Sequence, residues 1–170
     1  MKKFALILTI IMSLAVSKNA IAQGTIVDVA VGNKDFSTLV TALKAADLVG
    51  ALQGEGPFTV FAPTNDAFAK IDPNTLGSLL EEKNQKVLAN ILTYHVIAGK
   101  IAATDVVSAL EKGKGTVELK ALNGQVLTVV QKDGKIWLKD LNGNYSEIVA
   151  TDVMGSNGVI HVINTVVMPN

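Results

Sequence analysis

The sequence contains no cysteine and no arginine, and only 5% of its residues are aromatic. Without cysteine the chain forms no disulfide, thiolate metal site or thiol nucleophile, and it has no cysteine that could carry a lipid anchor. All 15 basic residues are lysine, so no guanidinium group is present to bind phosphates or base edges at two points. Because 15 acidic residues balance these lysines, we expect no nucleic-acid partner.

The residues that are present are typical of one globular domain. The chain has 170 residues, of which 49% are hydrophobic. This length accommodates one domain with a substantial core but not two. We see no internal repeat of domain size, and we assign residues 23–170 to a single domain.

The first 22 residues have the pattern of a secretory signal peptide. Lys2 and Lys3 precede a mostly apolar run over residues 4–16, and small residues suited to cleavage occupy positions 20–22. The apolar run is shorter than the ~20 residues of a membrane-spanning helix, so cleavage is preferred over an uncleaved anchor. Removal of residues 1–22 leaves 12 lysines against 15 acidic residues, a net charge of −3. We expect an exported protein without a transmembrane anchor, located in the periplasm, at the cell surface or outside the cell.

Helical patterns dominate the first half of the remaining chain. Thr25 and Asp28 have the spacing of a capping box, and apolar residues recur with helical periodicity over residues 36–43 and 84–92. Asp72-Pro73 predicts the start of another helix, and residues 104–105 predict a further short one.

The second half has the pattern of an antiparallel meander. Asn123-Gly124, Asp133-Gly134 and Asn142-Gly143 are dipeptides that favour two-residue hairpins with positive φ at both positions, and strand-forming segments lie between them. The apolar run over residues 158–168 predicts a covered central strand. Helices in one half and strands in the other indicate an α+β fold.

Residues able to carry chemistry are few. His95 and His161 are the only histidines, and each lies in an apolar setting that favours a buried ring bonded to the backbone. A cleft beside either histidine, serving a small-molecule carrier or an enzyme, is the alternative. Asp140, Asn142 and Asn144 have the spacing of a calcium loop, but Tyr145 stands where that loop needs glycine, so a hairpin turn is preferred. We expect no catalytic residues, no metal and no cofactor.

Three segments together resemble the fasciclin (FAS1) family. Residues 58–68 resemble the first family signature, residues 156–163 resemble the second, and residues 92–97 resemble its Tyr-His motif. The resemblance extends over about residues 25–169. From the residues themselves, we interpret 58–68 as a core strand that joins a helix. The signature positions expected to build the fold are Thr59, Phe61, Pro63, Thr64, Asn65, Phe68, Asn157, Gly158 and His161.

The resemblance implies adhesion by a β-wedge flanked by helices. In animal members, integrin recognition is assigned to the Tyr-His region and to an Asp-Ile-Met stretch; the matching residues here are Tyr94, His95 and Asp152-Val153-Met154. Ala150-Thr151 replaces the Glu-Pro that precedes the latter in the family. The sequence therefore predicts an exported, non-enzymatic interaction module whose partner is a surface or matrix protein or a polysaccharide.

Overall fold

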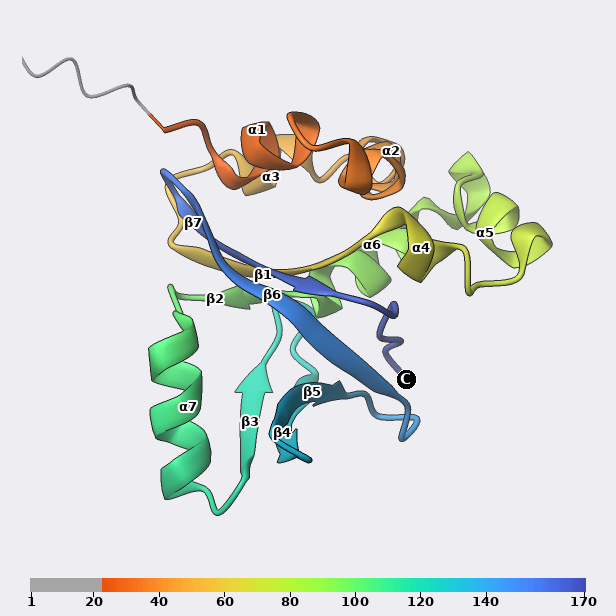
Figure 1. The fold of residues 1–170 in the computed structure, drawn as a ribbon. Coiled ribbons are helices and arrows are strands. Elements are labelled where there is room, and N and C mark those ends of the chain that lie inside the picture. The colour runs from red at the N-terminus through yellow and green to blue at the C-terminus, as the bar shows by residue number, and fades with distance from the viewer. Residues whose placement is uncertain (1–22) are drawn as a thin grey trace, which may run out of the picture.

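The structure, a computed structural model, describes residues 23–170, so the expected signal segment lies outside it. A seven-stranded sheet has the strand order β2-β1-β7-β6-β5-β4-β3, and helices surround it (Figure 1). The strands are β1 (Phe58–Pro63), β2 (Val96–Ala98), β3 (Thr116–Lys120), β4 (Val126–Lys132), β5 (Lys135–Lys139), β6 (Tyr145–Gly155) and β7 (Gly158–Ile163). The helices are α1 (Ile26–Val31), α2 (Ser37–Ala45), α3 (Val49–Leu52), α4 (Asn65–Phe68), α5 (Pro73–Leu79), α6 (Gln85–Tyr94) and α7 (Ala103–Lys112), with 3₁₀ turns η1 (Lys34–Phe36) and η2 (Glu82–Asn84).

The expected α+β class and the antiparallel meander are confirmed, and the sheet has one parallel pair in addition. Strands β3 to β7 follow one another as antiparallel neighbours. β1 then lies parallel to β7, with Phe58 opposite Gly158. A parallel pair needs a long crossover, which the intervening helices and meander supply.

The pair β1 and β7 has a hydrophobic core on each face. Helices α1, α2 and α3 lie above the pair, whereas α7 and strands β3 to β5 lie below it (Figure 1). Val60 and Ala62 of β1 belong to the helix-side core, while Phe61 between them belongs to the meander-side core. The helix-side core includes Phe36, Leu39, Leu43, Phe68, Leu92 and Ile160. The meander-side core includes Phe61, Tyr94, Leu127, Leu138, Ile163 and Val167.

Most of the predicted helices form, with two differences. Thr25 and Asp28 make the expected capping box of α1, and Asp72 caps α5 through its carboxylate. The prediction that Val87 lies on the buried stripe of α6 is wrong, because its side chain is 51% exposed. Helix α7 begins at Ala103, one residue earlier than predicted. No helix within residues 23–170 is long and apolar enough to cross a membrane.

The hairpin prediction is right about the pairing and only partly right about the turns. Asp133 and Gly134 both have positive φ, as a two-residue turn requires. In the other two turns only the glycines, Gly124 and Gly143, have positive φ, because these loops are longer. The last strand ends at Ile163 and not at Met168. After Ile163 the chain leaves the sheet, and its backbone donates to side chains.

Gly158 permits the close approach of β7 to β1. A Cβ placed on it would lie 2.2 Å from the Phe58 carbonyl oxygen, and backbone at a sheet centre cannot move away cheaply. We expect Gly158→Ala to lower the free energy of unfolding by about 1–3 kcal/mol, the usual cost of overpacking. Urea denaturation measures this. Gly77→Ala, at a helical site with nothing within 4 Å, is the matched control and should be neutral or stabilising. Equal midpoints for the two variants would contradict the prediction.

Candidate functional site

The residues of the first signature join a strand to a helix. Pro63 ends β1, and the Thr64 hydroxyl accepts from the Ala67 backbone N–H, which caps α4. The Asn65 side chain then reaches the preceding helices: its Oδ1 accepts from Thr38 N at 3.0 Å, and its Nδ2 donates to Lys34 O at 2.8 Å. Asn65 thus satisfies a backbone N–H in the first turn of α2, which an isolated helix would leave unpaired, and a carbonyl of the preceding turn η1.

Asn157 performs the same task in the second signature. Its Nδ2 donates to Leu52 O at 2.8 Å and to Gly54 O at 2.7 Å, and its Oδ1 accepts from Ile26 N at 2.9 Å. Only 8% of the Asn157 residue surface is exposed. One amide side chain therefore joins the start of α1 to the end of α3, beside the turn that leads into β7.

The segment over residues 99–103, which leads from β2 into α7, is held by side chains from three other strands. The Thr59 hydroxyl donates to Gly99 O at 2.7 Å and accepts from Ile101 N at 2.9 Å. His161 Nε2 lies 2.7 Å from Ile101 O, and its Nδ1 accepts from Asp152 N at 3.4 Å. Because Ile101 O only accepts and Asp152 N only donates, the His161 proton sits on Nε2.

His95 is enclosed by the chain in the same manner. Its Nδ1 donates to Ile91 O at 2.8 Å, and its Nε2 accepts from Val167 N at 3.2 Å. Burial lowers the pKa of His95 to about 4, since the imidazolium form would be desolvated, and the bond to Ile91 opposes this only in part. The ring is therefore neutral at pH 7 and serves as a fixed connector between α6 and the C-terminal tail.

Tyr94 and His95, which the resemblance suggests as partner-contacting residues, are not exposed in this structure, and their binding role stays a prediction. Tyr94 is 0% exposed and His95 is 2% exposed. The Tyr94 hydroxyl donates to Val126 O at 2.9 Å, and burial together with the nearby Asp140 carboxylate raises the Tyr94 pKa. Both side chains lie inward because α6 ends at the sheet, where its last turn faces the core.

The stretch Asp152-Val153-Met154 lies on β6, and Asp152 falls where the register with β7 shifts between Ala150 and Val153. All three residues are half-buried. Asp152 has a φ of 58°, and its Oδ1 accepts from the Ala103 backbone N–H, at the start of α7, at 2.9 Å. Val153 packs against the helix-side core. This stretch therefore carries structural contacts, and its binding role stays a prediction.

Asp140, considered above as a calcium ligand, organises a turn instead. Its Oδ1 accepts from the backbone N–H groups of Asn142 and Asn144 at 3.0 and 2.8 Å. Its Oδ2 accepts from the Asn144 side chain at 3.1 Å and from Met168 N at 3.2 Å. The carboxylate closes the β5–β6 hairpin and anchors the C-terminal tail.

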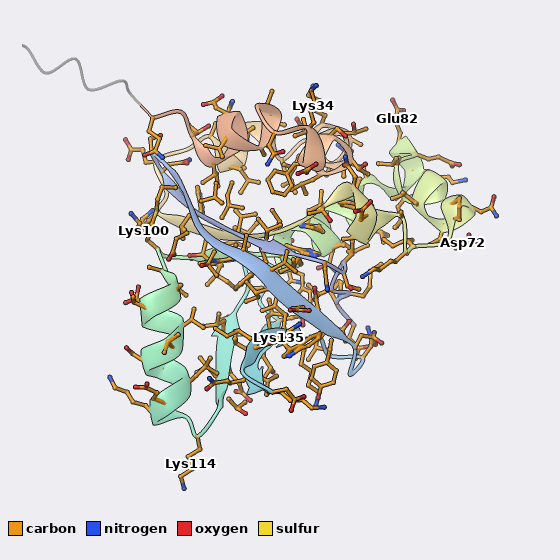
Figure 2. All side chains as sticks on the ribbon, in the orientation of Figure 1. Lys34, Asp72, Glu82, Lys100, Lys114 and Lys135 are labelled. Carbon is orange, nitrogen blue, oxygen red and sulfur yellow. The ribbon has the colours of Figure 1, made fainter. Side chains whose placement is uncertain are left out.

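Sequence reasoning missed a hollow on the outer side of the meander. Lys132, Asp133, Trp137 and Tyr145 line it, and its volume is about 200 Å³. Lys135 lies nearby and forms an ion pair of 2.7 Å with Glu147; Figure 2 shows it over the strands, whereas Lys114 extends away from the protein. The only tryptophan of the chain, Trp137, lies in a predicted strand and is the sequence feature that could have indicated this surface.

Comparison with known proteins identifies relatives along nearly the whole described chain. Protein sll1483 of Synechocystis sp. (strain ATCC 27184 / PCC 6803 / Kazusa) is 52% identical over 145 residues, which cover 85% of this chain and 73% of that protein. Cell surface glycolipoprotein MPB83 of Mycobacterium bovis (strain BCG / Tokyo 172) is 36% identical, covering 87% of this chain and 62% of MPB83. Transforming growth factor-beta-induced protein ig-h3 of Sus scrofa is 40% identical, covering 86% of this chain but 20% of ig-h3.

The comparison of structures and the comparison of sequences both find fasciclin domains. A FAS1 domain pair from the insect cell adhesion molecule fasciclin I superposes with a TM-score of 0.73, covering 84% of this chain and 50% of that one at 20% identity. The sequence pattern of the Fasciclin domain matches residues 34–169. The chain therefore belongs to the fasciclin domain family.

Proposed function

We propose that this protein is an exported interaction module that acts by contact with a surface or matrix protein or a polysaccharide, and not by catalysis. The observation that carries the proposal is what the polar side chains of the family motifs contact in this protein. His95, His161 and Asn157 bond to backbone groups of their own chain through both side-chain polar atoms. These residues build a scaffold, which leaves the outer surface for recognition.

The names of two similar proteins support this proposal. MPB83 is a cell surface glycolipoprotein, and fasciclin I is a cell adhesion molecule. Export of the present chain is part of the proposal and is supported by the signal-like pattern of residues 1–22.

The alternative, a small-molecule cleft beside His95 or His161, is less well supported. Each ring is almost fully buried, and both of its nitrogens are bonded to the backbone. A ligand at either ring would have to displace these bonds, and the buried backbone groups would then be unpaired.

The proposal is tested by retention of the purified protein on cell layers and on extracellular matrix of the source organism. The heat-unfolded protein is the control, because it presents the same composition without the folded surface. We expect the folded protein to be retained and the unfolded one to be washed away. Equal retention of the two would contradict a role that depends on the fold.

A further inference from the structure

Within the described residues, no other element packs a hydrophobic core against the outer face of the meander. Strand pairing places Lys139 opposite Tyr145 and Trp137 opposite Glu147, so these residues project from one side. The neighbouring residues Leu138 and Ser146 project to the other side and are buried. The outer face of the meander thus has two aromatic rings on adjacent strands.

The hollow described above lies between these rings and the β4–β5 turn. It has a volume of about 200 Å³ and is lined by Lys132, Asp133, Trp137 and Tyr145. This is smaller than the roughly 300–1,000 Å³ that is usual for a drug-sized ligand. The hollow suits one ring-sized group presented by a longer molecule.

The lining combines two kinds of chemistry. Tyr145 is 49% exposed, so its ring is open to a ligand, and Trp137 is half-buried beside it. The Trp137 Nε1 donor is buried and has no hydrogen-bond partner within residues 23–170, and the Lys139 ammonium lies 5.9 Å from the centre of the Tyr145 ring. Asp133 supplies an acceptor and Lys132 supplies donors at the rim.

The geometry points to a binding site for one pyranose unit of a polysaccharide in this hollow. A pyranose ring has C–H faces that stack on aromatic rings, and its hydroxyl groups need both acceptors and donors around them. Indole and phenol rings with a carboxylate and an ammonium group meet both requirements. This inference rests on the proposed function and narrows its partner to a glycan.

A glycan fits this surface better than a protein partner. A stable protein interface buries about 800 Å² on each side around a desolvated apolar centre. Here the two rings are surrounded by charged groups, among them the ion pair of Lys135 with Glu147. Polysaccharides instead present single rings along an extended chain, and one such ring is of the size that this hollow accommodates.

The test uses the full protein and the fluorescence of Trp137, which is the only tryptophan and lies in the site. Cellohexaose provides a neutral probe and a galacturonic acid hexamer provides an acidic one. We expect a saturable fluorescence change with at least one hexamer. Tighter binding of the neutral probe would indicate that Asp133 recognises the hydroxyl groups of the sugar. Tighter binding of the acidic probe would indicate that the lysines recognise its carboxylate groups.

Tyr145→Ala keeps the fluorophore and should weaken binding by about tenfold or more, as loss of an aromatic anchor does. Val31→Ala removes a side chain that is 59% exposed on α1, away from the hollow, and should leave binding unchanged. No saturable change with either hexamer at millimolar concentration would overturn the inference. Equal binding by Tyr145→Ala and the unchanged protein would overturn it as well.

The same variant separates this inference from the proposed function. If Tyr145→Ala is retained on matrix as well as the unchanged protein and neither hexamer binds, the glycan site is wrong while the interaction role stands. If the unchanged protein is retained no better than its unfolded form, the proposed function itself fails.

Discussion

Acidification from pH 7.5 to pH 4.5 is expected to lower the free energy of unfolding by roughly 2–3 kcal/mol through His95 alone. Burial lowers the His95 pKa to about 4 in the folded protein, whereas in the unfolded chain the pKa returns to the ordinary histidine value of 6.5. Between these values the unfolded state binds the proton and the folded state does not. The contribution is therefore complete above pH 6.5 and is lost as the pH falls toward 4.

Protonation also has a geometric cost at this site. His95 Nε2 accepts from the Val167 backbone N–H, and a protonated nitrogen would place two donors against each other. The C-terminal tail should then detach from α6 when the ring becomes charged. We expect the first acid-induced change to appear in the NMR signals of residues near Val167.

Urea denaturation at a series of pH values, for the unchanged protein and for His95→Gln, measures this effect. Glutamine keeps a donor and an acceptor but does not titrate in this range. The unchanged protein should lose stability more steeply than the variant between pH 6.5 and pH 4.5. Parallel curves would show that His95 does not carry the dependence.

Asn157→Ala is expected to lower the free energy of unfolding by about 3 kcal/mol or more. The substitution removes the partners of Leu52 O, Gly54 O and Ile26 N. Leaving a buried polar group unsatisfied costs about 1–3 kcal/mol, and three groups are affected here. Some of this cost is recovered where water enters the site.

Asn157→Asp distinguishes the hydrogen bonds from the loss of packing. It keeps the shape but places an oxygen against the two carbonyl groups that Nδ2 serves, so we expect a loss at least as large as with alanine. Asn74→Ala, at an exposed position of α5, is the control and should change stability by less than about 0.5 kcal/mol. Thermal unfolding followed by circular dichroism measures all three variants. A small effect of Asn157→Asp would mean that the amide donor is dispensable.

Local patterns predicted the parts of the fold that local interactions determine. The capping box at Thr25, the Asp72 cap and the Asp133-Gly134 turn depend on residues within four positions of each other, and all three form. The length of the loops at Gly124 and Gly143 depends on strand register, which the dipeptides alone do not specify. Val87 matched the helical period but lies outside the buried face of α6.

The site was less accessible to sequence reasoning because it depends on distant partners. Asn157 bonds to Leu52, 105 residues away, and His95 bonds to Val167, 72 residues away. The sequence indicated correctly that both histidines are buried, since their neighbours are apolar. It did not show that Tyr94 is buried too, nor that pairing between β5 and β6 brings Tyr145 near Trp137.

The parallel pairing of β1 with β7 affects how the protein folds during its synthesis. Phe58 pairs with Gly158, so β1 must wait for 100 further residues before its parallel neighbour β7 exists. At a translation rate of about 5–20 residues per second, that wait is at least about 5 seconds. During this time β1 lacks one of the two strands that flank it, so the centre of the sheet cannot form until the chain is nearly complete.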